Sequence, residues 1–169
     1  MARAPLNIAL AIDVSGSMSG ARLEAAKKAA VGLAAQLTEQ DRLSLVSFGS
    51  DVVVHLDAVT VHAGTLPMIR QTIEALETSG MTNLSDGWFT AVDCAARIAE
   101  RDPRMTLGSF CSVMVMRTAA LRKRVNWGAC SSAPVAGVLT SALGIGDDYD
   151  EHLCVASLKA VADVCTMLR

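Results

Sequence analysis

The sequence predicts an α/β fold built on a mostly parallel sheet, and three observations lead to this prediction. A short apolar run over residues 8–12 ends at Asp13 and passes directly into a Ser/Gly turn, which is typical of a buried parallel strand. An amphipathic helical pattern follows this turn. Strand and helix patterns then alternate along the chain, as expected where helices connect the parallel strands of one sheet.

The elements after the first strand are expected in this order: a helix at 21–40, a strand at 43–48, one or two β segments at 52–61, a helix at 66–78 and a helix at 88–100. The first helix has one apolar face, made of Leu23, Ala26, Ala30, Leu33, Ala34 and Leu37. Asp41 and Arg42 are expected to form the turn that follows it.

The turn sequence FGSD between the next two β segments predicts a hairpin, and therefore one antiparallel edge strand. An edge position suits an exposed His55 and Asp57, and we interpret His55 and His62 as solvated residues. Pro67 in its first turn marks the start of the second helix. The third helix has Phe89, Val92, Ala96 and Ile98 as its candidate core contacts.

The regular spacing of apolar residues is lost after Arg104 and returns near the C-terminus. MTLGSFCSVMVM is compatible with a strand, whereas the stretch that follows it has no clear period or cap. Residues 138–145 then predict a strand, which ends in GDDYD at the same edge of the sheet as Asp13. A last helix is expected to begin near Glu151, and we interpret Asp147 and Asp148 as a solvated loop that caps it.

Length and composition indicate one globular domain over residues 1–169. Apolar residues make up 51% of the 169, and the net charge of −2 gives no sign of a nucleic-acid partner. No stretch approaches the roughly 20 apolar residues of a membrane span, and no secretory leader is recognised, so a cytoplasmic location is the default expectation. The five cysteines show no metal-ligand spacing and are expected to be isolated thiols.

Candidate metal ligands stand at the tip of the first strand. Asp13, Ser15 and Ser17 alternate there, with Gly16 between the serines giving the turn its backbone freedom. Ligands of open α/β sheets bind outside the carboxyl ends of the strands. One carboxylate and two hydroxyls are hard oxygen donors, which suit Mg2+ better than zinc or copper.

At these residues the chain resembles von Willebrand factor type A (vWA) domains. DVSGS is similar to the Asp-x-Ser-x-Ser signature of their metal-ion-dependent adhesion site, and the similarity continues through RLEAAKKAA, DRLSLVSFGS, GMTNLSDG and TSALGIGDDYDE. The resemblance implies a three-layer Rossmann-like fold with helices on both faces of the sheet. It also implies a non-catalytic module, like those of bacterial vWA proteins, that binds protein.

The resemblance further implies a role for each candidate residue. Ser15 and Ser17 would ligate Mg2+, or Mn2+ or Ca2+ in its place, and Asp13 would bind directly or through a water. Thr82 in GMTN matches the family's threonine, which joins the shell when a ligand arrives. A carboxylate from a partner protein would then complete the coordination. Asp86 is interpreted as the cap of the third helix.

The chain departs from the family where a second metal carboxylate is due. vWA domains carry Asp-Gly-x-Ala-Asn after a hydrophobic run, and this sequence has VMVMRT there. Val113–Thr118, back-translated and read from the third base of each codon, permits Asp-Gly-His-Ala-Asn. The same shift applied to Leu158–Asp163 permits Glu-Gly-Gly-Gly-Gly, which resembles the glycine-rich end of the last helix in these domains.

We therefore predict that the reading frame slips near Met105, is restored before Ala136 and slips again after His152. The poorly matching segments would then be 105–135 and 153–169, which hold four of the five cysteines, Cys111, Cys130, Cys154 and Cys165. Resequencing the coding DNA from Arg101 onward checks this prediction, because a continuous frame with Asp-Gly-x-Ala-Asn should appear. If the present frame is confirmed, the chain should lack a core strand and a metal carboxylate.

Two alternatives to a metal-dependent binding module stay open at this point. The first is a degenerate vWA fragment that binds no metal. The second is a Mg2+-dependent phosphoryl-transfer enzyme with Asp13 as its nucleophile, because such folds also place an aspartate at a strand tip. That chemistry needs a second carboxylate nearby, and no motif places a catalytic Lys or His. The identity of the partner and the oligomeric state do not follow from the sequence.

Overall fold

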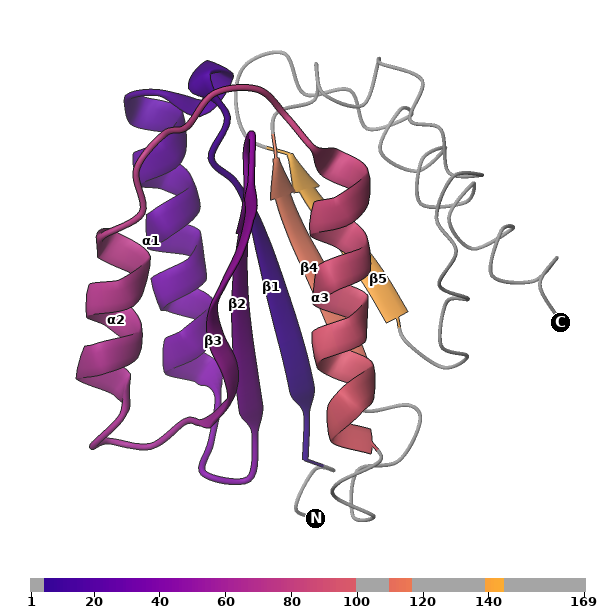
Figure 1. Cartoon of the computed structure of the whole chain (residues 1–169). Coiled ribbons are helices and arrows are strands. Elements are labelled where there is room, and N and C mark those ends of the chain that lie inside the picture. The colour runs from indigo at the N-terminus through magenta and orange to yellow at the C-terminus, as the bar shows by residue number, and fades with distance from the viewer. Residues whose placement is uncertain (1–4, 100–109, 117–138, 145–169) are drawn as a thin grey trace, which may run out of the picture.

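Five strands form one mixed sheet in the computed structural model, which describes residues 5–99, 110–116 and 139–144 (Figure 1). The strands are β1 (Asn7–Asp13), β2 (Arg42–Phe48), β3 (Val52–Thr60), β4 (Phe110–Met116) and β5 (Leu139–Gly144). Their order is β3-β2-β1-β4-β5, and all neighbours are parallel except β2 and β3. The predicted parallel sheet with one antiparallel edge strand is confirmed.

Helices cover both faces of this sheet, as the resemblance implies. Among the described residues they are α1 (Ala21–Gln36), α2 (Leu66–Glu74) and α3 (Leu84–Ala99), with a short 3-10 turn, η1 (Gly16–Met18), before α1. Figure 1 shows α1 and α2 together on one face and α3 on the other. Every residue of β1 is buried, because a central parallel strand has helices on both sides.

The two faces of β1 have different partners. Ile8, Leu10 and Ile12 pack in one apolar cluster with residues of α1 and α2. On the opposite face, the side-chain amide of Asn7 donates a hydrogen bond of 2.6 Å to the carbonyl of Ala95 in α3. The alternation of side chains along a strand therefore divides the core into two layers.

The first helix ends earlier than predicted, at Gln36 rather than at residue 40. The reason is the buried carboxylate of Asp41. Its Oδ2 accepts hydrogen bonds from the backbone N–H and the hydroxyl of Thr38, at 2.6 and 3.0 Å, and its Oδ1 accepts one from the N–H of Leu6 at 2.8 Å. These bonds draw the chain out of the helix. Arg42 is the first residue of β2 and does not belong to the turn.

The bounds of the other two helices also differ from the prediction. α2 ends at Glu74 instead of 78, although Leu76 beyond it is still buried. α3 begins at Leu84 instead of 88. The interpretation of Asp86 as the cap is wrong, because Asn83 precedes the helix. The side chain of Asn83 accepts a hydrogen bond from the Asp86 N–H at 3.5 Å and donates one to the Asp86 carboxylate at 2.7 Å.

The edge strand β3 confirms the predicted hairpin. His55 and Asp57 are exposed on it, as expected, and His55 also lies 2.7 Å from the hydroxyl of Ser47 on β2. Partial burial lowers the pKa of His55, which favours a neutral ring in this contact at neutral pH. Ala58, with φ at 55°, marks an irregularity in the strand.

The strand β4 lies in the stretch where a frame slip is predicted. It pairs in register with β1 on one side and β5 on the other. The expectation that the chain, read as printed, lacks this core strand is therefore wrong. The frame slip itself stays a prediction. Residues 117–138 and 145–169, with Asp147, Asp148 and the helix expected near Glu151, lie outside the described residues.

Candidate functional site

The sequence-predicted site residues gather at the carboxyl edge of the sheet, where the parallel strands end. Asp13, the last residue of β1, lies opposite Phe48 at the end of β2. The connection from α2 to α3, residues 75–83, crosses from one face of the sheet to the other over this edge (Figure 1). We call residues 79–83 of this connection the crossing loop. It carries Thr82.

Asp13, Ser15 and Ser17 form one hydrogen-bonded turn. Oδ1 of Asp13 accepts a hydrogen bond of 2.8 Å from the N–H of Ser15, and the hydroxyl oxygens of the two serines lie 3.1 Å apart. Exposure rises outward along the turn, because Asp13 is 0% exposed, Ser15 is 2% exposed and Ser17 is open to solvent. The carboxylate therefore lies behind the two hydroxyls.

Backbone hydrogen bonds hold the crossing loop against this turn and against the β2–β3 turn. Ser79 N–H donates to the carbonyl of Val14 at 2.6 Å, and Gly16 N–H donates to the carbonyl of Gly80 at 3.0 Å. On the other side of the loop, Asn83 N–H donates to the carbonyl of Gly49 at 2.9 Å. Thr82 is half-buried between these anchors, so the structure brings its segment to the strand tip as expected.

Two glycines permit this close approach. Gly80 has φ at +49°, a left-handed conformation that side chains disfavour, and a Cβ there would overlap the hydroxyl of Ser50. A Cβ on Gly49 would lie 2.5 Å from the carbonyl oxygen of Ser79, which is backbone and cannot swing away. The loop therefore reaches the turn only because both positions lack a side chain.

Sequence reasoning missed the residues that fix this loop. Ser50 accepts a hydrogen bond of 3.0 Å from the N–H of Met81, and the side chain of Asn83 accepts one from the Asp86 N–H in the first turn of α3. Ser50 is 31 residues from Met81, so no local pattern joins them. The GMTN segment was noted for Thr82 alone, and its asparagine is a favoured helix N-cap residue, which is a signal that could have identified Asn83.

The described part of the chain gathers no group of three His, Cys, Asp or Glu side chains that could hold a metal ion. The candidate donor set here is one carboxylate with hydroxyls. Nor is any helix among the described residues long and apolar enough to span a membrane.

Other reactive side chains in the described residues are poor candidates for catalysis. Cys94 on α3 is a buried free thiol, as predicted for an isolated cysteine. Its pKa is raised chiefly by burial, which keeps the thiol protonated and inert. Ser47 stands beside His55 in the manner of a nucleophile and a base, but it is only 5% exposed. Its hydroxyl therefore does not face a substrate.

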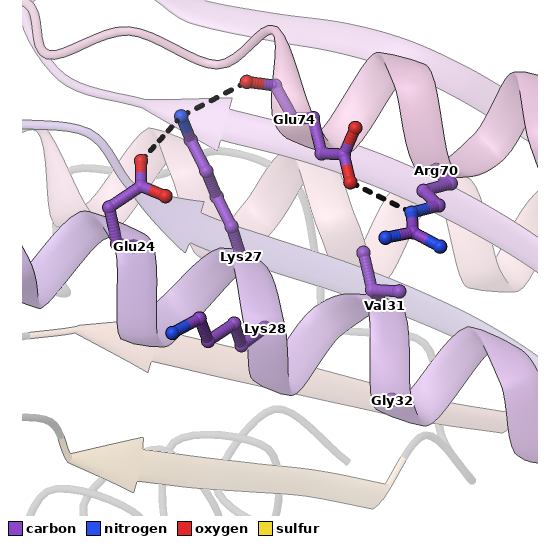
Figure 2. Close-up of a pocket in the computed structure, with 7 residues that line it drawn as sticks. All are labelled: Glu24, Lys27, Lys28, Val31, Gly32, Arg70 and Glu74. Atoms are coloured by element: carbon purple, nitrogen blue, oxygen red, sulfur yellow. Dashed lines mark hydrogen bonds and ion pairs between the residues drawn. The ribbon is translucent and has the colours of Figure 1, made fainter.

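A groove of about 450 Å³ lies between α1 and α2, and Figure 2 shows the residues that line it. Its lining residues are Glu24, Lys27, Lys28, Val31, Gly32, Arg70 and Glu74. Lys27 donates hydrogen bonds to the Glu24 carboxylate at 3.1 Å and to the Glu74 carbonyl at 3.0 Å, and Arg70 donates one to the Glu74 carboxylate at 2.8 Å. Each of these two carboxylates is thus paired with a cation of its own helix, and the bond from Lys27 to the Glu74 carbonyl joins α1 to α2.

Comparison with known proteins points to one family. A profile of the von Willebrand factor type A domain matches residues 6–164. An uncharacterized protein of Synechocystis is 38% identical over 95 residues, which cover 56% of this chain and 22% of that protein. Human inter-alpha-trypsin inhibitor heavy chain H3 is 33% identical over 119 residues, or 68% of this chain and 13% of that one. The chain thus spans under a quarter of either relative.

Solved structures share the fold at low sequence identity. A von Willebrand factor type A protein from Catenulispora acidiphila superimposes with a TM-score of 0.67 at 16% identity, over 96% of this chain and 37% of that chain. Proximal thread matrix protein 1 from the mussel byssus, solved with a zinc-occupied MIDAS motif, has a TM-score of 0.59 at 16% identity, over 89% and 38%. The pilus tip protein Mfa5 domain from Porphyromonas gingivalis has a TM-score of 0.54 at 23% identity, over 70% and 39%.

Proposed function

Because the chain belongs to the von Willebrand factor type A family, we propose that it is a non-catalytic protein-binding module. In this proposal a divalent cation at the carboxyl edge of the sheet binds an acidic group of a partner protein. Ser15 and Ser17 ligate the cation, Asp13 balances its charge directly or through a water, and Thr82 joins when the partner arrives. Mg2+ is the proposed ion, with Mn2+ and Ca2+ as alternatives.

The spacing of the two serine hydroxyls is the observation that best supports this proposal. Octahedral Mg2+ holds its oxygen ligands at about 2.0–2.1 Å, so neighbouring ligands lie about 3.0 Å apart. The Ser15 and Ser17 oxygens are separated by 3.1 Å. One ion therefore fits both hydroxyls without a rearrangement of the turn, and the carboxylate of Asp13 belongs to the same turn through its bond to the Ser15 amide.

The donor set also supports the binding of an acidic partner group. Hydroxyl oxygens carry no formal charge, so an ion held by two serines and one aspartate keeps much of its positive charge. This charge attracts a carboxylate of a partner protein, which then completes the coordination shell. The zinc-occupied MIDAS motif in the mussel byssus protein gives one precedent for a metal in this fold.

The burial of Asp13 argues against the alternative of a phosphoryl-transfer enzyme. An aspartate nucleophile must reach the phosphorus of its substrate, whereas Asp13 is 0% exposed and lies behind Ser15. We expect no hydrolysis of p-nitrophenyl phosphate in the presence of Mg2+. Turnover that disappears in the Asp13→Asn variant would instead establish the enzyme.

A calorimetric titration of the metal-free chain with MgCl2 tests the proposed function, with MnCl2 and CaCl2 run alongside. We expect one ion per chain. At a hundredfold excess over Kd the ion should stabilise the fold by about 2.7 kcal/mol, which raises Tm by about 5–10 °C. The absence of heat and of any Tm shift with all three ions would favour the degenerate, metal-free alternative.

A further inference from the structure

Met81 is the most exposed large apolar side chain of the described residues. It is 79% exposed, whereas the next, Val53, is 45% exposed. Met81 belongs to the crossing loop and directly precedes Thr82. An isolated apolar residue on a surface is common and needs no explanation by itself. Met81, however, lies at the rim of the candidate site, and its backbone is held by hydrogen bonds. These two features together suggest a function for its exposure.

The backbone around Met81 is fixed at almost every residue. Its own N–H donates to the Ser50 hydroxyl, and the backbone groups of Ser79, Gly80 and Asn83 are bonded to neighbouring turns. The left-handed Gly80 immediately before it has no room for a side chain. Met81 therefore projects into solvent from a rigid frame, and its exposure does not come from a loose loop.

A rigid frame changes what an exposed side chain contributes to binding. Ordering a loop on association costs free energy, and this loop is already ordered. Methionine has a flexible, polarizable side chain that adapts to varied apolar surfaces. Burial of its apolar area under a partner is favourable. We propose that Met81 is an apolar contact for the partner and that it selects segments in which a large apolar side chain stands near the coordinating carboxylate.

This inference rests on the proposed metal-dependent binding, because the carboxylate sets where the partner segment lies. The partner is then a linear or looped protein segment that carries Asp or Glu with a large apolar residue one to three positions away. A purely acidic segment would bind the cation but leave Met81 in water.

The test uses a displayed library of random peptides, selected on the Mg2+-loaded chain and eluted with EDTA. We expect the eluted sequences to combine an acidic residue with a neighbouring large apolar residue. A synthetic peptide of the enriched sequence is then titrated by fluorescence polarisation. The Met81→Ser change should weaken its binding by about tenfold, and Met81→Leu should bind within about twofold of wild type.

Met68→Ser is the matched control. Met68 is a second exposed methionine, at 41%, and it lies on α2 outside the crossing loop. This change should leave peptide binding as it is. Equal affinity of Met81→Ser and wild type, or an equal loss in Met68→Ser, would overturn the role of Met81 while Mg2+-dependent binding persists. Failure of the proposed metal-dependent binding would give a different result, because no peptide would then elute with EDTA. The proposed role of Met81 would be overturned together with it.

Discussion

Replacing Asp13 by asparagine is expected to weaken Mg2+ binding by at least about a hundredfold. The change removes the negative charge of the carboxylate that is bonded to the Ser15 amide, and the affinity of oxygen-ligand sites depends strongly on the number of charged ligands. Asparagine keeps the side-chain oxygen that accepts the Ser15 N–H at 2.8 Å. The turn should therefore survive, and the loss should be one of metal affinity rather than of structure.

Calorimetry with MgCl2 measures the affinity, and a thermal melt in EDTA shows that the variant is folded. Asp86→Asn is the matched control, because it removes the same charge from a carboxylate in the first turn of α3, where Asp86 is bonded to Asn83. This control should bind Mg2+ within about threefold of wild type. If Asp13→Asn binds Mg2+ as tightly as wild type, the metal lies elsewhere and the assignment of this site is wrong.

The residues of the site were predictable to the extent that they are close in sequence. Asp13, Ser15 and Ser17 alternate after a buried strand, so their types and spacing alone suggest hard-metal chemistry. Thr82 entered only through the family resemblance. The contacts that bring its loop to the strand tip join Gly16 to Gly80 and Ser50 to Met81. Such contacts between distant segments leave no local periodicity in the sequence.

The fold shows the same division between local and distant signals. The order of strands and helices through the first hundred residues follows from hydrophobic periodicity, whereas the helix ends do not. α1 stops at Gln36 because Asp41 binds the Thr38 amide, although residues 37–40 are compatible with a helix. β4 was uncertain because a strand without clear alternation is stabilised by its neighbours, and here it lies between β1 and β5.

Adding a methyl group at Gly87 is expected to destabilise the metal-free fold by about 1–3 kcal/mol and to lower Tm by about 3–10 °C. Gly87 lies in α3 where the helix meets β2. A Cβ there would be 2.5–2.7 Å from Cγ, Cβ and Cδ1 of Phe48, which is 0% exposed. These atoms are at the root of the ring and cannot rotate out of the way. The overlap should therefore exceed the roughly 1 kcal/mol that alanine gains over glycine within a helix.

Gly32→Ala tests the same substitution without the overlap. Gly32 lies within α1, is exposed, and has nothing within 4 Å of the added Cβ. This change should stabilise the fold by about 0.5–1 kcal/mol, because alanine favours the helix more than glycine does and no steric overlap opposes it. Thermal melts of the two variants should thus shift in opposite directions. If both raise Tm, α3 does not pack closely on β2. Asn83, the last residue of the crossing loop, is bonded to Asp86 in the first turn of α3. A displaced helix in Gly87→Ala should therefore also weaken Mg2+ binding, whereas Gly32→Ala should leave it unchanged.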